Sequence, residues 1–203
     1  MSTQTKSRTA VYLSPRLAGT LMTPEEFDAA RRFKDGYRYE LVHGVLVVSP
    51  PPLPTESDAN EELGHWLRDF WELHPGVMDA TVPQHYMRTQ TSRRIADRAI
   101  WVGLGRLPNH RRDVPTIVVE FVSRSRRDRQ RDYEDKRQEY MAVGIAEYWI
   151  IDRFRRTLTA VRPERPDQVV PETAAFTTPH LPGFEPPLAK LLAVADRWAK
   201  RKG

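Results

Sequence analysis

Residues 115–128 read PTIVVEFVSRSRRD, and this stretch decides the fold that the sequence predicts. Its first half is apolar on both faces of a strand, as expected for a central strand that is covered on both sides. One carboxylate, Glu120, lies in the middle of this apolar run. A buried carboxylate is costly unless a salt bridge, hydrogen bonds or a metal ion compensates its charge. The alternative is that Glu120 lies at the fraying end of the strand.

Helical and strand patterns alternate on both sides of this strand. Helices are predicted by apolar spacing and capping residues, and strands by β-rich runs bounded by turn residues. The predicted helices are 23–33, 56–74, 126–143 and 188–200, and the predicted strands are 80–89, 93–103 and 116–123, with hairpins at 37–50 and 147–163. This order indicates an α/β (α+β) fold, in which helices flank a central mixed sheet and extra N-terminal and C-terminal β-hairpins extend it.

Three boundary signals in this pattern can be tested. Thr23 is expected to cap the first helix, and His43-Gly44 resembles a tight hairpin turn. Ser125 and Asp128 form an S-x-x-D capping pattern before the helix predicted at 126–143. The first 20 residues are polar, so we expect a lead-in at 1–20 and a single domain at 21–200.

The composition of the 203-residue chain limits the class of protein. It contains no cysteine, which excludes disulfides and thiolate metal sites and favours the cytoplasm. No apolar stretch is long enough to span a bilayer, so we expect no membrane partner. The net charge of +5 is concentrated in arginine-rich segments. This charge is typical of a nucleic-acid partner, although a well-solvated surface explains it equally well.

Two further acids occur within predicted strands. Asp97 alternates onto the same strand face as bulky apolar neighbours, and Glu40 lies between apolar residues in YELV. Together with Glu120, these are three embedded acids on three predicted strands. A hard, oxygen-seeking cation would explain this pattern, because Mg²⁺ is held by one or two carboxylates with water and phosphate completing its shell.

Lys136 is the least expected residue of the predicted 126–143 helix. At about 100° per residue, Tyr133, Lys136, Tyr140 and Val143 fall on one stripe, which would face the sheet. The helix follows the Glu120 strand directly, so it can fold back and bring Lys136 to the carboxylates. The alternative is a lysine whose stem packs on the core while its ammonium reaches water. Carboxylates, a metal and a lysine together indicate phosphodiester hydrolysis, because the metal activates water and the lysine orients it or stabilises charge.

With these residues considered, the chain resembles the Uma-two family of restriction endonucleases, which belongs to the PD-(D/E)xK nuclease superfamily. The resemblance runs from LMTPEEF to LPGFEPPLAKLL, which is most of the chain. Its most specific part is 117–152, where a D-x-x-x-K-x-x-x-Y helix is followed by G-x-x-E-Y-W-x-x-D. The earlier YELVHGVLVVSPPP is similar to the family pattern Y-E-L-x-x-G-x-L-x-x-x-S-P.

The resemblance implies a restriction-endonuclease-like core and assigns roles within it. Asp97 corresponds to the aspartate of the PD half and Glu120 to the (D/E), and both would be ligands of Mg²⁺ or Mn²⁺. The lysine of xK falls at Val122, so the resemblance implies that Lys136 supplies the amine. Glu40 would be an additional acid of the catalytic site.

The implied partner is DNA, and members of the family are often considered dimeric, so a homodimer is an implied assembly. The basic segments would hold the phosphate backbone. The arginines expected to do so are Arg94, Arg98, Arg124, Arg126 and Arg127.

Two departures from the family pattern leave a second function open. Ala96 stands where the proline of PD is found, and many relatives carry a histidine at the start of the helix after the S-P loop. In this chain that region reads PTESDAN, with Ser57 or a neighbour at the histidine position. The alternative function is therefore a weakened or inactive nuclease fold that acts as a nucleic-acid-binding or interaction module.

Overall fold

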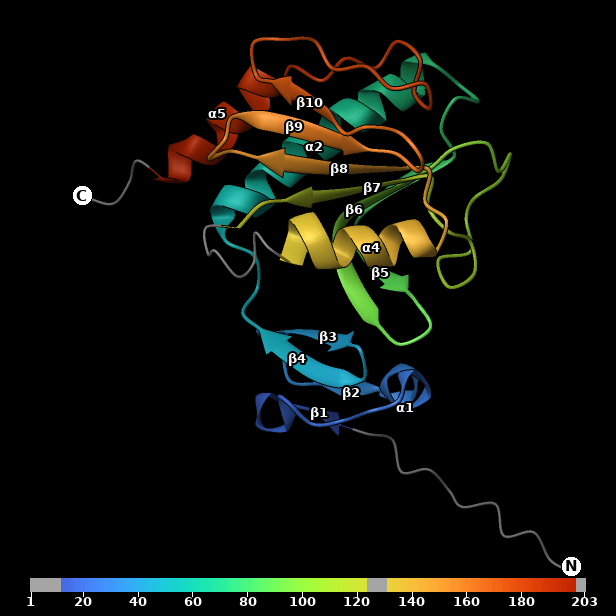
Figure 1. Ribbon diagram of the computed structural model, residues 1–203, viewed down its shortest axis with the longest axis vertical. Helices are drawn as coiled ribbons and strands as arrows, with labels where there is room; N and C mark the ends of the chain where they lie inside the picture. The colour runs from blue at the N-terminus through green and yellow to red at the C-terminus, as the bar shows by residue number, and fades with distance from the viewer. Residues whose placement is uncertain (1–11, 124–130, 200–203) are drawn as a thin grey trace, which may run out of the picture. The chain divides into compact units, whose positions relative to one another are not determined.

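The computed structural model describes residues 12–123 and 131–199 (Figure 1). The chain forms two compact units, which we describe separately. The N-terminal unit comprises Met1–Pro51 together with Gln90–Arg94, and the main unit comprises Pro52–Thr89 together with Ile95–Gly203. Strand β6 (Arg93–Trp101) starts in the N-terminal unit and continues in the main unit.

The main unit is organised by a mixed sheet. Its strands follow the order β10-β9-β8-β7-β6, and β5 pairs with β6. The pair β7–β8 is parallel, whereas β6–β7, β8–β9 and β9–β10 are antiparallel. The strands are β5 (Ala80–Arg88), β6 (Arg93–Trp101), β7 (Ile117–Phe121), β8 (Glu147–Asp152), β9 (Thr157–Val161) and β10 (Gln168–Pro171).

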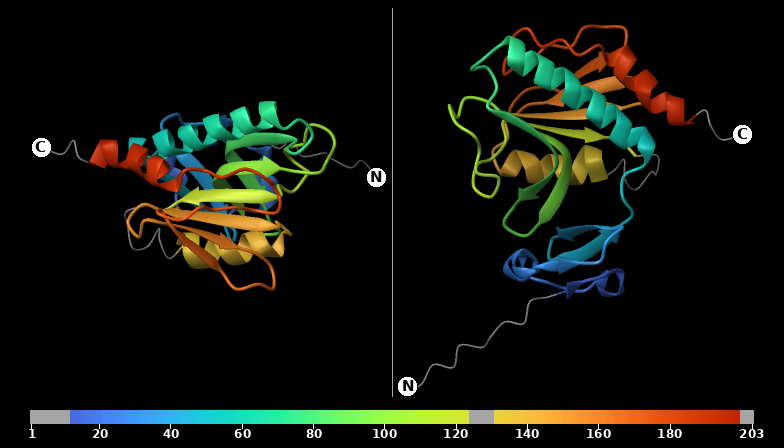
Figure 2. Two further views of the ribbon diagram at one scale, coloured as in Figure 1. Left: turned by 90° about the horizontal axis from the view of Figure 1, so that it is seen from above. Right: turned by 180° about the vertical axis from the view of Figure 1, so that it is seen from behind.

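Helices cover both faces of this sheet, as the left view of Figure 2 shows. One face carries α2 (Pro54–Leu73) and α5 (Leu188–Ala199), and the other carries α4 (Lys136–Ala142). Val119 of β7 belongs to the core shared with α2 and α5, while its neighbour Val118 belongs to the core shared with α4. Successive residues of a strand point to opposite faces, so an apolar run without alternation is what a doubly covered strand requires.

These observations confirm the predicted fold class, a mixed sheet flanked by helices. Hairpins are also present at the predicted positions, since β3 (Arg38–Val42) pairs with β4 (Val45–Ser49) and β8 pairs with β9 in antiparallel register. None of the helices within residues 12–123 and 131–199 combines the length and apolar character needed to span a bilayer. The prediction of a single domain over 21–200 stays a prediction.

The N-terminal unit contains a hairpin and a short capped helix. The hairpin joins β3 (Arg38–Val42) to β4 (Val45–Ser49) through His43 and Gly44, whose φ angles are +48° and +79°. Two successive positive φ angles match the tight turn expected there, because this twist fits the twist of the strands. Leu41 of β3 also pairs with Arg93 at the start of β6.

The remaining elements of this unit precede the hairpin. They are β1 (Tyr12–Leu13), the 3₁₀ turn η1 (Pro15–Leu17), α1 (Pro24–Ala29) and β2 (Arg32–Phe33), with β1 and β2 paired in parallel. Thr23 caps α1 as predicted: its hydroxyl accepts from the Glu26 N–H, and the Glu26 carboxylate accepts from the Thr23 N–H. The expected lead-in at 1–20 thus includes a strand and a turn among its described residues.

The helix predicted at 126–143 differs from the expectation at its start. Residues 131–135 form a π-helical segment, η2 (Arg131–Asp135), and the α-helix begins only at Lys136. The capping pattern of Ser125 and Asp128 lies outside the described residues. At the other end, Gly144 adopts a φ of +87°, a left-handed conformation that ends the helix as expected from glycine.

Candidate active site

Glu120 is the centre of the candidate site, and its charge is compensated within the protein. Its side chain is buried on β7. The Lys136 Nζ lies 2.7 Å from Glu120 Oε2, and the exposed fractions of these two side chains are 3% and 2%. The Tyr140 hydroxyl donates to Glu120 Oε1 at 2.9 Å. A buried carboxylate with a cation and a hydrogen-bond donor avoids the penalty of an unpaired charge.

Lys136 and Tyr140 come from one stripe of the segment that follows β7. Lys136 and Tyr140 are buried on α4, and Tyr133 and Val143 pack against the same core. The stripe expected from helical spacing is therefore present, and it carries Lys136 to Glu120. The hydrogen bond from Tyr140 was not predicted, although its spacing of four residues from Lys136 on the same face was a usable signal.

Asp97 lies on β6, the neighbouring antiparallel strand. The ladder pairs Arg98 with Val119, so Asp97 and Glu120 are the next residues along the two paired strands. Asp97 Oδ2 accepts from the Phe121 N–H at 2.9 Å, and the Gln84 side-chain amide lies 3.4 Å from Oδ1. The two carboxylates expected to act together are thus held on adjacent strands.

A buried arginine fixes the backbone next to Asp97. Arg98 donates from Nε to Asn60 Oδ1 at 2.8 Å and from Nη2 to the Asn60 carbonyl at 2.7 Å. Asn60 Nδ2 in turn donates to the Asp97 carbonyl at 2.7 Å. Burial lowers the pKa of Arg98 to about 10. The network ties α2 to β6 at the position of Asp97.

The close approach of Arg98 to α2 depends on a glycine. A Cβ atom added at Gly64 would lie 2.3 Å from Arg98 Nη2. The guanidinium thus occupies the space that any other residue at this position would fill. Arg98 is fully buried, so its guanidinium braces the fold and is not presented at the surface for a phosphate contact.

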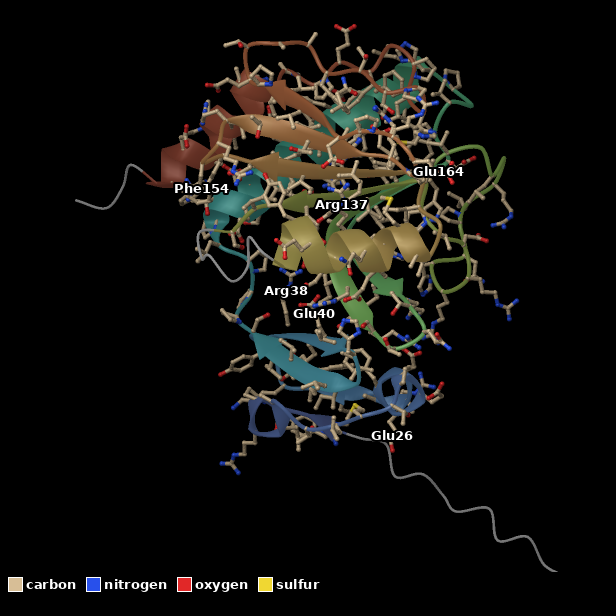
Figure 3. The ribbon with its side chains drawn as sticks, in the orientation of Figure 1. Glu26, Arg38, Glu40, Arg137, Phe154 and Glu164 are labelled. Atoms are coloured by element: carbon tan, nitrogen blue, oxygen red, sulfur yellow. The ribbon has the colours of Figure 1, made fainter. Side chains whose placement is uncertain are left out.

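The remaining residues that the sequence predicted for the site are Glu40 and four arginines, and they belong to other segments of the chain. Arg94 and Glu40 belong to the N-terminal unit, and both side chains are buried. Glu40 pairs with Val47 in the β3–β4 hairpin, and Figure 3 labels it on that strand. Its role as an additional acid stays a prediction. Arg124, Arg126 and Arg127 lie outside the described residues.

The first turn of α2 supplies a further carboxylate in the region where the family resemblance implies a histidine. The Ser57 hydroxyl donates to the Leu53 carbonyl at 3.3 Å, within its own helix. The neighbouring Glu56 instead accepts from the Ser123 hydroxyl at 3.0 Å, just past the end of β7. Glu56 therefore lies beside the Glu120 strand. Sequence reasoning missed it because an acid in the first turn of a helix is ordinarily explained by the helix dipole.

The donor set determines which metal the site could hold. Within the described residues, no cluster of three or more His, Cys, Asp or Glu side chains is arranged to bind a metal ion. Asp97 and Glu120 provide two carboxylates on adjacent strands, the number that a magnesium-type site takes from a protein when water and substrate phosphate complete its shell, and their role as metal ligands stays a prediction. An ionised carboxylate has about four lone-pair sites on its two oxygens, so a hydrogen-bonded carboxylate can also bind a metal ion.

Comparison with solved structures identifies the class of fold. The chain resembles a crystal structure described as a putative nuclease belonging to DUF820 from Anabaena variabilis ATCC 29413, with a TM-score of 0.68 and 14% sequence identity. The match covers 86% of this chain and 99% of that one. The fold is therefore a nuclease-like mixed sheet flanked by helices.

Comparison with family models then identifies the family. Residues 24–195 match the Uma2 model, described as "Putative restriction endonuclease". This match spans most of the chain, including the strands of Asp97 and Glu120 and the helix of Lys136. The protein belongs to the Uma2 family, as the resemblance in its sequence indicated. A search of the curated proteins finds no match.

Proposed function

We propose that this protein is a metal-dependent endonuclease that hydrolyses phosphodiester bonds in DNA. The observation that carries the proposal is the buried ion pair between Lys136 and Glu120. Glu120 lies on β7, and Asp97 lies on the adjacent strand, β6. An ion pair with almost no exposure is an expensive way to stabilise a fold, since apolar residues of similar volume often serve better. Membership in a family described as restriction endonucleases supports a catalytic use for it.

In this proposal, Asp97 and Glu120 bind Mg²⁺ or Mn²⁺ on the two strands. A bound metal ion polarises a phosphate oxygen and lowers the pKa of a coordinated water. Asp97 is oriented for this task because its Oδ2 accepts from the Phe121 N–H, which fixes the carboxylate against β7. Tyr140 holds the Glu120 carboxylate by its hydroxyl and so keeps it from rotating away.

Lys136 has two functions in this proposal. In the free protein its ammonium compensates the charge of Glu120. With DNA bound, the same ammonium is close to where negative charge develops on the phosphate, and a fixed cation there lowers the barrier because it needs no reorganisation. Its Nζ–H can also orient the attacking water.

DNA is the proposed partner because of the net charge and the family description. The chain carries a formal charge of +5, with arginine concentrated in 124–131. Proteins that neutralise phosphates with arginine and lysine gain affinity by releasing counterions. The homodimer that the family resemblance implies is retained as a proposal for the assembly.

Cleavage of supercoiled plasmid DNA tests the proposed activity. The protein is incubated with plasmid and Mg²⁺, and nicked and linear products are measured over time. We expect cleavage that stops in EDTA and is reduced at least about 100-fold by Asp97→Ala. Asp69→Asn is the matched control, because Asp69 is an exposed acid on α2 with a solvent-facing partner, His65. Equal cleavage by the Asp97 and Asp69 variants would contradict the assignment.

The same plasmid, with binding measured beside cleavage, decides between an enzyme and a binding module. A module without catalysis would retain DNA affinity in EDTA and after Lys136→Met combined with Glu120→Gln, yet produce no cleaved plasmid under any metal. An RNA substrate of the same sequence, assayed in parallel, distinguishes a ribonuclease from the proposed DNA endonuclease.

A further inference from the structure

Tyr133 lies on η2, the π-helical segment directly before Lys136. Its hydroxyl donates to Asp152 Oδ2 at 3.1 Å. Asp152 is the last residue of β8, and its side chain is fully buried. The segment that leads into α4 is therefore tied to the sheet one turn ahead of Lys136.

Asp152 is itself rigidly held, so it provides a fixed anchor. Its Oδ1 accepts from the N–H groups of Phe154 and Arg155 at 2.8 and 3.0 Å, in the turn that follows β8. A carboxylate that caps a turn in this way has little freedom to move. Its second oxygen remains for the Tyr133 hydroxyl.

The ring of Tyr133 is held as well as its hydroxyl. The Arg155 guanidinium carbon lies 5.0 Å from the ring centroid, a cation–π arrangement. The Arg155 Nε lies 3.8 Å from Asp152 Oδ2. Burial and the charge of Asp152 raise the pKa of Tyr133 to about 12, so the hydroxyl stays protonated and donates at neutral pH.

The position of this anchor relates directly to the candidate site. Strand β8 pairs in parallel with β7, and Glu120 is opposite Ile150. Asp152 therefore lies two residues beyond the partner of Glu120, on the adjacent strand. Tyr133 and Lys136 thus tie the start of α4 to two adjacent strands, β8 and β7.

We propose that the Tyr133–Asp152 hydrogen bond is a positioning device that determines where the Lys136 ammonium meets Glu120. Tyr133 and Asp152 are positioning residues, because they act through Lys136. The catalytic consequence rests on the proposed endonuclease function, whereas the structural consequence does not depend on it.

A second tie on the same helix offers a matched control. Arg137, labelled in Figure 3, makes a two-point contact with Asp167 at 2.6 and 2.8 Å. The side chains of this pair are 38% and 30% exposed. It holds α4 from the residue next to Lys136 but involves none of the groups around Glu120. Exposed pairs of this kind contribute little to stability.

The experiment compares Tyr133→Phe with Arg137→Gln in the full-length protein. The first readout is hydrogen–deuterium exchange of the 136–142 amides, which needs no activity. The second is kcat and KM for plasmid cleavage with Mg²⁺. We expect Tyr133→Phe to accelerate exchange in 136–142 and to lower kcat about 10-fold with little change in KM, as is usual for residues that orient a catalytic group. Arg137→Gln should change neither quantity appreciably.

Substitutions at Asp152 provide a rescue test. Asp152→Asn keeps an oxygen for the turn amides and a group that can hydrogen-bond with the Tyr133 hydroxyl. It should therefore retain more activity, and slower exchange in 136–142, than Asp152→Ala. A purely electrostatic role of Asp152 predicts that the two variants behave alike, which would overturn the proposal.

The two readouts separate failure of this inference from failure of the proposed function. If the wild-type protein does not cleave plasmid, the endonuclease proposal is overturned. If Tyr133→Phe still accelerates exchange of the 136–142 amides, the positioning device is supported. Cleavage and exchange equal to those of Arg137→Gln would overturn the positioning device alone. Faster exchange throughout the main unit, not confined to the helix, would also overturn it, because Tyr133 would then be only a general stabiliser.

Discussion

At the scale of single residues, Lys136 and Glu120 compensate each other in a place that water hardly reaches. Lys136→Met leaves the Glu120 charge buried without its cation, so we expect a loss of about 3 to 5 kcal/mol in the free energy of unfolding. Adding Glu120→Gln removes the uncompensated charge, so the double variant should recover part of this loss. Urea denaturation of the wild type, both single variants and the double variant gives the coupling free energy between Lys136 and Glu120. Additive losses would show that the pair contributes nothing as a pair.

His85 gives a second residue-scale prediction, on the pH dependence of stability. It is buried edge-on against Trp101, and burial lowers its pKa from 6.5 to about 4. The unfolded chain therefore binds a proton that the folded protein excludes, so stability falls as the pH falls from 6.5 toward 4. Between pH 7 and pH 5 this amounts to about 2 kcal/mol.

The measurement is urea denaturation at pH 7 and pH 5 for the wild type and for His85→Phe, which keeps a ring against Trp101. The pH-dependent loss should be about 2 kcal/mol smaller in the variant. His65→Gln, on the exposed surface of α2, is the control and should leave the loss unchanged. An identical loss in the wild type and His85→Phe would refute the assignment.

At the scale of elements, the packing of α2 on β6 depends on the space at Gly64. Alanine in a helix is ordinarily favoured over glycine by about 1 kcal/mol. Here Gly64→Ala would displace the Arg98 guanidinium from both of its contacts with Asn60. We therefore expect the opposite sign, a loss of about 2 kcal/mol or more, because a buried charged group loses its partners.

A double-variant comparison isolates this effect. Arg98→Met removes the guanidinium and opens the space that the alanine methyl needs. In that background, Gly64→Ala should be neutral or stabilising in thermal or urea denaturation. A loss of the same size with and without Arg98 would show that the guanidinium is not the cause.

The elements also show what sequence can and cannot predict. Strand β7 and the Lys136 stripe were predictable because apolar runs and helical spacing report directly which faces are buried. The π-helical start was not, since a spacing of 100° per residue assumes an α-helix throughout. Strand β10 was missed because it is short and ends at Pro171, a residue that disfavours strands.

Burial of Arg98 escaped prediction for a different reason. Arginine is rarely fully buried, so sequence reasoning assigns it to the surface by default. The backbone carbonyl and side chain of Asn60, brought near by the packing of α2, and the Thr81 hydroxyl accept hydrogen bonds from its guanidinium and so compensate its burial. The contact between Lys136 and Glu120 was foreseeable from order along the chain, whereas the contact between Arg98 and Asn60 depends on tertiary packing that no local pattern reports.

At the scale of the whole molecule, the charge of +5 predicts how DNA binding depends on salt. Each neutralised phosphate contributes about 0.9 to the slope of log affinity against log salt, so affinity should fall steeply as salt rises. Replacing Arg124, Arg126 and Arg127 by glutamine should reduce this slope by about 2 to 3 if all three contact phosphates. The measurement is fluorescence anisotropy of labelled duplex DNA in EDTA, which keeps binding separate from cleavage.

The matched control for this prediction is chosen from three arginines elsewhere in the chain. Arg153, Arg155 and Arg156 already have carboxylate partners within the main unit. Of these, Arg153→Gln is the suitable control, because its only ion pair among the described residues is a 4.0 Å contact with Asp196. It lowers the net charge without touching the 124–127 segment. If one such substitution reduces the slope as much as each of the three, the chain attracts DNA through its overall charge, and the arginines after β7 have no specific part in holding the backbone.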